Sequence, residues 1–196
     1  EHEKVSRTEA RTRTLQLFRE VMLPDPERTF KAYPHQVSGG QKQRVMIAMA
    51  LACNPDILIA DEPTTALDVT VQKTILELLR TLQKKHNISL IFISHNLDVI
   101  AEIAQDVLVM YKGEIVEKGT ISQLFNHPQH PYTKGLLACR PPLGKRPHRL
   151  KVIADFIHPN GVEGESFVTV AERSLMHTKL YSKEPILKAE GINTIF

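Results

Sequence analysis

Apolar residues recur along this chain with two different spacings, and their alternation predicts a mixed α/β fold. A helical spacing marks residues 8–22 and 71–85, and the run 45–53, rich in Met, Ala, Ile and Leu, is expected to be a mostly buried helix. Short continuous apolar runs at 57–60 and 88–93 instead have the length of buried parallel strands, covered on both faces. Helices that alternate with such strands favour a parallel sheet with helices packed against it.

The pattern continues with a further helix and a hairpin. Residues 97–104 are expected to form a helix, and residues 107–118 two strands about the turn Lys112–Gly113. From residue 140 to 183 the apolar runs become short, and Pro, His, Arg and Gly become frequent. This change of composition predicts an irregular linker.

Two chemical features lie within residues 37–68. Ser38, Gly39 and Gly40 leave a helix N-terminus without bulky side chains, so a polyphosphate can approach its backbone N–H groups. Asp61 and Glu62 follow the apolar run 57–60. One carboxylate is suited to hold Mg²⁺ through water, and the other to polarise an attacking water. Together they predict a hydrolase.

The order of these features resembles the ATP-binding-cassette ATPases over roughly two thirds of the chain. Residues 37–41 resemble the cassette signature, 57–62 the Walker B strand and 65–68 the D-loop. His95, after the second apolar run, resembles the switch histidine. The resemblance implies an α/β fold: the C-terminal half of a cassette-type P-loop NTPase, with a parallel-sheet core and a helical subdomain, followed by the linker.

The same resemblance assigns roles to individual residues. It implies that Asp61 serves Mg²⁺ through water, that Glu62 is the general base or water-positioning residue, and that His95 contacts the γ-phosphate of ATP. It also implies contact with ATP that is held mainly by another cassette, through Ser38, Gly39, Gly40, Gln41 and Asp68.

Each of these residues also has a purely structural interpretation. A Ser-Gly-Gly sequence is usually a flexible turn, and His95 after a buried strand is in isolation more often a satisfied structural histidine. Asp68 is placed to cap the helix that begins near Val69, a role compatible with the D-loop. The joint order of the motifs favours the functional interpretation.

A phosphate loop of the pattern GxxxxGK[ST] is not found before the signature. The chain is therefore interpreted as a fragment of a larger protein, and we expect it to hydrolyse little or no ATP in isolation. Residues 1–53 are expected to be part of the helical subdomain, with the signature, and residues 54–126 half of the catalytic core. The expected C-terminal extension is 127–140, the linker is 141–183, and the first strand of a second cassette is 184–196.

The extension HPQHPYTKGLL at 127–137 resembles cassettes that serve oligopeptide, dipeptide and nickel importers. The resemblance implies import of peptides, nickel or related small solutes, from the cytoplasmic face of the inner membrane. Its implied partners are permease subunits, a second cassette in the same or a partner chain and, indirectly, a solute-binding protein. The alternatives are a non-transport ATPase that acts on nucleic acid or ribosomes, and an inactive interaction fragment.

Composition adds bounds to this interpretation. The net charge of +3 comes from dispersed Lys and Arg residues without a recognition module, so no nucleic-acid partner is expected. No run of about 18 apolar residues is present. The two cysteines, Cys53 and Cys139, suggest no disulfide. His127, His130, Cys139 and His148 have prolines between them that break metal-ligand spacing, which favours loop and helix-cap roles.

Overall fold

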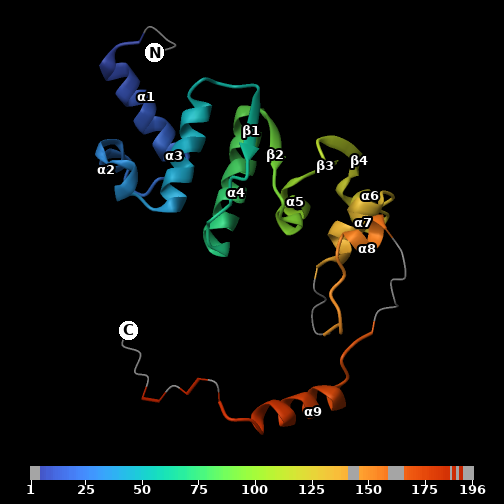
Figure 1. Ribbon diagram of the computed structural model, residues 1–196. Helices are drawn as coiled ribbons and strands as arrows, with labels where there is room; N and C mark the ends of the chain where they lie inside the picture. Colours follow the sequence, from blue (N-terminus) through green and yellow to red (C-terminus); the bar gives the residue numbers. More distant parts are fainter. Residues whose placement is uncertain (1–4, 141–145, 159–165, 186, 189, 192–196) are drawn as a thin grey trace. The chain divides into compact units, whose positions relative to one another are not determined.

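The computed structural model describes residues 5–140, 146–158, 166–185, 187–188 and 190–191. They fall into two units, Glu1–Gln105 and Asp106–Phe196, each with its own packing. The elements of the first unit (Figure 1) are α1 (Arg7–Glu20), α2 (Pro26–Lys31), the 3₁₀ turn η1 (Pro34–Gln36), α3 (Gly39–Leu51), β1 (Ile57–Asp61), α4 (Val69–His86), β2 (Ser89–Ile93) and α5 (Leu97–Ile103).

The second unit begins with a hairpin and continues with helices. Its elements are β3 (Asp106–Tyr111), β4 (Glu114–Thr120), α6 (Ile121–Asn126), α7 (Pro131–Ala138), α8 (Ala154–Ile157) and α9 (Val170–Tyr181). Among the described residues of both units, no helix is long and apolar enough to cross a bilayer.

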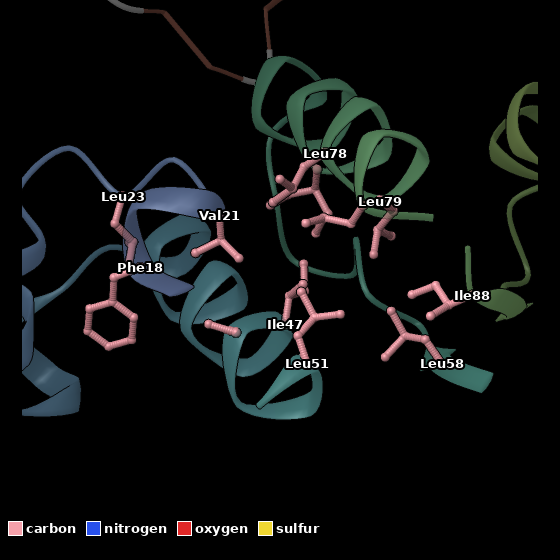
Figure 2. Packing of buried hydrophobic residues seen from close by; sticks show 12 residues of the cluster. Phe18, Val21, Leu23, Ile47, Leu51, Leu58, Leu78, Leu79 and Ile88 are labelled. Atoms are coloured by element: carbon pink, nitrogen blue, oxygen red, sulfur yellow. The ribbon is translucent and has the colours of Figure 1, made fainter. Parts of the chain in front are cut away.

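Strands β1 and β2 pair in parallel, and α4 is the helix that connects them. The register runs from Ile57 opposite Ser89 to Asp61 opposite Ile93. Buried leucines of α4 pack against Leu58 and Ile88 (Figure 2), and the same cluster continues to Ile47 and Leu51 of α3. The predicted order of helices and parallel strands is therefore confirmed.

The expectation that these strands are covered on both faces is wrong for the described residues. Leu58 is buried, but Ile57, Ile59, Ile91 and Ile93 are 55%, 64%, 48% and 47% exposed. Successive side chains of a strand point to opposite faces of the sheet, and α4 packs on the face that carries Leu58. An apolar run shows that a strand suits burial; it cannot show that this chain supplies the covering element.

Helix α1 packs against both α2 and α3, and a partly buried polar contact links α3 to the end of α1. Arg44 of α3 donates from Nη1 to the carbonyl oxygen of Val21, at 2.6 Å, just after α1 ends. Burial lowers the pKa of the Arg44 guanidinium. A cation at this place also complements the negative end of the α1 dipole.

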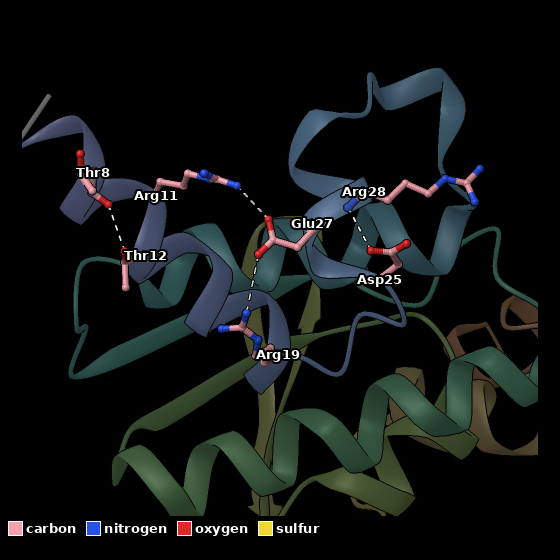
Figure 3. Close-up of polar contacts among 7 residues, drawn as sticks. All are labelled: Thr8, Arg11, Thr12, Arg19, Asp25, Glu27 and Arg28. Atoms are coloured by element: carbon pink, nitrogen blue, oxygen red, sulfur yellow. Dashed lines mark hydrogen bonds and ion pairs between the residues drawn. The ribbon is translucent and has the colours of Figure 1, made fainter.

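Ion pairs between α1 and α2 lie at the surface (Figure 3). Glu27 of α2 accepts from Arg11 at 3.0 Å and lies 3.8 Å from Arg19, both on α1. Asp25 caps α2 by accepting from the backbone N–H of Arg28 at 3.0 Å. Because the paired side chains are about half exposed or more, each ion pair contributes at most about 1 kcal/mol.

A more buried polar cluster joins α1 to the end of α4. Glu20 Oε1 contacts Lys85 Nζ at 3.0 Å and also His86 Nε2, while its own side chain is only 12% exposed. Burial raises the pKa of the Glu20 carboxyl, but hydrogen bonds from Lys85 and His86 outweigh burial and hold the pKa below the ordinary value. Glu20 is therefore the acidic centre of a contact between two helices far apart in sequence.

The hairpin of the second unit has the predicted turn. Lys112 and Gly113 both have positive φ, at 52° and 85°, as the two central residues of a type I′ turn require. Strands β3 and β4 are antiparallel, with an irregularity between Val109 and Met110. The turn prediction from Lys112–Gly113 is confirmed.

The segment that follows α6 is held against this hairpin by one carboxylate. Glu117 of β4 accepts from the backbone N–H groups of Gln129 and His130 at 2.7 and 3.0 Å. Burial raises the pKa of Glu117, but these hydrogen bonds and the neighbouring Thr133 outweigh it and lower the pKa. His130 Nδ1 accepts from the backbone N–H of Tyr132, so His130 caps α7, the kind of role expected for it.

The expected linker is less irregular than its composition suggests. Within 141–183 the structure has the short helix α8 and the 12-residue helix α9. Thr169 and Glu172 form a capping box that starts α9, although none of its side chains is buried. The segment 184–196 was expected to be a strand. No strand is formed by its described residues, which are 184–185, 187–188 and 190–191, and its other residues lie outside the described part of the chain.

We predict that Leu79→Ala costs about 2–5 kcal/mol of unfolding free energy, because Leu79 is buried in the core shared by α3, α4 and the sheet. Urea denaturation of the chain measures this change. Met49→Ala, on the exposed side of α3, is the matched control and should cost less than about 0.5 kcal/mol. Equal losses from both variants would contradict the packing described.

We also predict a pH-dependent contribution from Glu20. A carboxylate whose folded pKa is lowered stabilises the protein above the ordinary glutamate value of 4.5, and this stabilisation disappears as pH falls through the folded pKa. Glu20→Gln should therefore be less stable than wild type at neutral pH, with the difference shrinking below pH 4.5. Chemical denaturation across pH tests this, with exposed Glu77→Gln as control; a pH-independent difference would argue against the cluster.

Candidate functional site

The parallel pairing of β1 and β2 brings the predicted catalytic residues together. Asp61 ends β1, and His95 follows β2 by two residues. Because parallel strands end at the same edge of a sheet, Glu62 and His95 become neighbours although 33 positions separate them. Nδ1 of His95 lies 2.7 Å from Oε1 of Glu62.

Three hydrogen bonds hold the Glu62 carboxylate. Oε1 accepts from the backbone N–H of His95 at 3.0 Å and contacts its ring, while Oε2 accepts from the Thr65 hydroxyl at 2.8 Å. The side-chain contact with His95 lowers the pKa of Glu62 most, and the Thr65 hydroxyl lowers it further. At neutral pH Glu62 is therefore a carboxylate with both oxygens oriented.

The backbone at Glu62 is held in a rare conformation. Its φ is 47°, in the left-handed region that a side chain with a Cβ seldom adopts. The Glu62 N–H donates to the carbonyl oxygen of Ile93 at 2.9 Å, which carries the strand pairing past the end of β1. Backbone strain of this kind clusters at functional sites, and here it coincides with the predicted base.

Asp61 is the remaining carboxylate at this edge of the sheet, and it is exposed. In the described part of the chain, no three His, Cys, Asp or Glu side chains gather closely enough to hold a metal ion. A single exposed carboxylate nevertheless fits Mg²⁺, which usually keeps several waters and takes its other ligands from phosphate oxygens. The donor set is compatible with Mg²⁺ bound together with a nucleotide.

The predicted phosphate-facing residues form the start of α3. The Ser38 hydroxyl accepts from the Gln41 N–H at 3.3 Å, and Gln41 Oε1 accepts from the Ser38 N–H at 2.9 Å. This is a capping box, in which each side chain satisfies a backbone donor of the other residue. The spacing S-x-x-Q in the sequence is a signal that predicts this structural role.

The glycines of this motif also have a packing role that sequence reasoning missed. A Cβ added to Gly40 would lie 2.7 Å from Cγ1 of Val71 on α4, and one added to Gly39 would lie 3.5 Å from Cδ2 of Leu67. Gly40 thus permits close approach of α4 to the start of α3. Val71 lies 31 positions further along the chain, so no local pattern could show this contact.

Asp68 begins α4. Its Oδ1 accepts from the backbone N–H of Val71 at 3.0 Å, which confirms the expected helix cap. The predicted D-loop, residues 65–68, therefore runs from the contact of Thr65 with Glu62 to the cap of α4. It also passes the start of α3, where Leu67 approaches Gly39.

A hollow of about 600 Å³, which no sequence pattern predicted, lies beside the start of α3. Gln41 contributes to its wall, together with Arg28 and Lys31 of α2 and Gln36 of η1. The two cations outnumber Asp25, the acidic residue that lines it. This hollow therefore carries net positive charge.

Two family models match the chain. Residues 1–65 match the model described as ABC transporter, and residues 116–156 match the C-terminal region of oligopeptide/dipeptide transporters. The first match ends at Thr65 and so includes the start of α3 together with Asp61 and Glu62. The second includes Glu117 and the segment that it holds.

Curated relatives include ATP-binding proteins of one import system and one transport system. The chain is 45% identical over 200 residues to the glutathione import ATP-binding protein GsiA of Shigella boydii. This alignment covers 100% of this chain and 30% of the relative. It is 56% identical over 147 residues to the peptidoglycan transport ATP-binding protein YejF of Agrobacterium fabrum, covering 75% of this chain and 27% of the relative. The chain thus spans less than a third of the length of these relatives.

Solved structures show the same fold. A dimeric ATP-binding cassette in a post-hydrolysis state, bound to ADP and Pi, aligns with a TM-score of 0.53 and 33% identity over 62% of this chain and 51% of its own. A component of the ABC transporter complex cbiONQ from Clostridium perfringens aligns with a TM-score of 0.55 and 31% identity, over 64% of this chain and 49% of its own. The fold is therefore part of an ABC-type P-loop NTPase.

We predict that Gly40→Ala destabilises the chain, although alanine in a helix normally gains up to about 1 kcal/mol over glycine. The new methyl group would meet Val71 at 2.7 Å, so α3 and α4 would have to separate. Val71→Ala in the same protein should recover most of the loss. Thermal unfolding of the two single variants and the double variant measures the coupling; additive effects would exclude the contact.

Proposed function

We propose that the chain is part of an ATP-hydrolysing subunit of an importer, because residues 1–65 match the ABC transporter model and residues 116–156 match the C-terminal region of oligopeptide/dipeptide transporters. The imported solutes are peptides, nickel or related small solutes. The observation that carries the proposal is the contact between Glu62 and His95 at the carboxyl ends of β1 and β2.

Glu62 acts as general base or water-positioning residue in this proposal. Its lowered pKa keeps the side chain ionised at neutral pH, as acceptance of a proton requires. His95, whose side chain is 79% exposed, is free to turn toward a γ-phosphate. Glu62 then has an oxygen available for the attacking water.

ATP and Mg²⁺ are the proposed ligands. Asp61 holds Mg²⁺, chiefly through water, beside the base. The metal neutralises charge on the phosphate oxygens when it is bound. The residues described here position the water and the metal, and the phosphate loop that binds most of the nucleotide is contributed by another part of the intact protein.

The start of α3 has a different proposed target, the ATP of a second cassette in the same or a partner chain. Ser38, Gly39, Gly40 and Gln41 approach its phosphates, and Asp68 contacts the facing cassette. The capping box already presents an N-terminus of a 13-residue helix in a fixed direction. The positive hollow beside it adds to the same electrostatic field.

Permease subunits are the proposed membrane partners, with a solute-binding protein engaged indirectly. The subunit works at the cytoplasmic face of the inner membrane, as a peripheral protein. The two relatives are named for glutathione import and peptidoglycan transport, and glutathione is itself a short peptide. The match of residues 116–156 favours transport over an ATPase that acts on nucleic acid.

We predict that Glu62→Gln lowers ATP turnover on the order of 100-fold or more, while ATP binding persists, because an amide cannot accept the proton. The test joins this chain to a phosphate-loop half taken from an ABC-type cassette and measures phosphate release and nucleotide binding separately. Exposed Glu114→Gln is the matched control. Unchanged turnover in Glu62→Gln would remove Glu62 from the proposed role.

A further inference from the structure

The two oxygens of the Glu62 carboxylate have different partners. His95 contacts Oε1 through both its backbone N–H and its ring, whereas Oε2 accepts only from the Thr65 hydroxyl, at 2.8 Å, among the hydrogen bonds of the described residues. The two partners also come from different places, since His95 follows β2 and Thr65 lies in the loop between β1 and α4. The carboxylate is thus fixed from two sides.

Thr65 itself is held by the backbone of its loop. Its N–H donates to the carbonyl oxygen of Glu62 at 3.2 Å, and the N–H of Leu67 donates to that of Thr64 at 3.3 Å. Thr64 is buried, and Ala66 has a φ of 63°. Two successive turns therefore fix the backbone from which the Thr65 hydroxyl reaches Oε2.

The far end of this loop is also anchored. Leu67 is partly buried against the core cluster of the first unit, and it lies close to Gly39 at the start of α3. Asp68 then fixes the beginning of α4. The loop is therefore held at both ends. The Thr65 hydroxyl on this loop keeps its direction when His95, the other partner of the Glu62 carboxylate, moves away.

We propose that Thr65 is a positioning residue for Glu62, which holds Oε2 while Oε1 exchanges its contact with His95 for the attacking water. This inference rests on the proposed function of Glu62. It assigns the two carboxylate oxygens different tasks: Oε2 fixes the orientation and Oε1 faces the reaction. It also makes the loop 65–68 a direct neighbour of the base, so that a facing cassette which contacts Asp68 acts on the segment that carries Thr65.

The first test measures steady-state ATP hydrolysis with Mg²⁺, using this chain joined to a phosphate-loop half taken from an ABC-type cassette. Thr65→Val keeps the shape of the side chain and removes the donor, whereas Thr65→Ser keeps the donor. We expect Thr65→Val to lower kcat by about 10- to 100-fold with KM for ATP unchanged, the effect of one lost hydrogen bond to a charged group. Thr65→Ser should restore kcat.

A matched control removes another threonine hydroxyl from the same unit. Thr81 donates to the carbonyl oxygen of Glu77 on the exposed side of α4, so Thr81→Val should leave kcat unchanged. Full activity of Thr65→Val would overturn the inference about Thr65, and so would a kcat that stays low in Thr65→Ser. As long as Glu62→Gln is still inactive, either result leaves the proposed function of Glu62 standing. Full activity of Glu62→Gln would instead overturn the proposed function.

A second test needs no catalysis and uses this chain by itself. The ¹³C resonance of the Glu62 carboxylate, assigned by its loss in Glu62→Gln, reports the hydrogen bond to Oε2. We expect this resonance to move in Thr65→Val and to stay in Thr65→Ser and Thr81→Val. An unmoved resonance in Thr65→Val would show that the hydroxyl does not bind Oε2, and the inference would be wrong.

Discussion

The parallel pairing of β1 with β2 is the constraint on which the candidate site depends. It places the ends of two strands at one edge of a sheet, and it does so because α4 crosses back over the sheet and packs on it. Glu62 and His95 meet only because of this pairing. The hydrophobic contacts of α4 therefore matter for the chemistry as much as for stability, since a loosened helix would separate the two strand ends.

Several residues of the first unit serve folding and the proposed chemistry at once. Ser38 and Gln41 cap the helix whose N-terminus they are proposed to present to phosphate, and Gly40, proposed to face the same phosphate, leaves room for Val71. Asp68 caps α4 within the loop proposed to face a second cassette. Such double use has a physical reason: a helix N-terminus binds an anion well only when its direction is fixed by its own caps and packing.

The sequence predicted the order of the elements correctly because hydrophobic spacing reports which face of an element is buried. It also predicted the turn at Lys112–Gly113 and the cap at Asp68, both of which are local. The sequence pattern did not predict the exposed isoleucines of β1 and β2 or the contact of Gly40 with Val71, because both features depend on distant parts of the fold. Helix α9 was missed although Thr169 and Glu172 carry a capping-box signal.

In a completed cassette, Glu62 and His95 should face the γ-phosphate of ATP. A structure of this chain joined to a phosphate-loop half, with ADP, vanadate and Mg²⁺ bound, would show whether they do. We expect His95 and Oε1 of Glu62 to face the vanadate, with Asp61 beside the Mg²⁺ and Thr65 still on Oε2. Vanadate bound away from both Glu62 and His95 would contradict it.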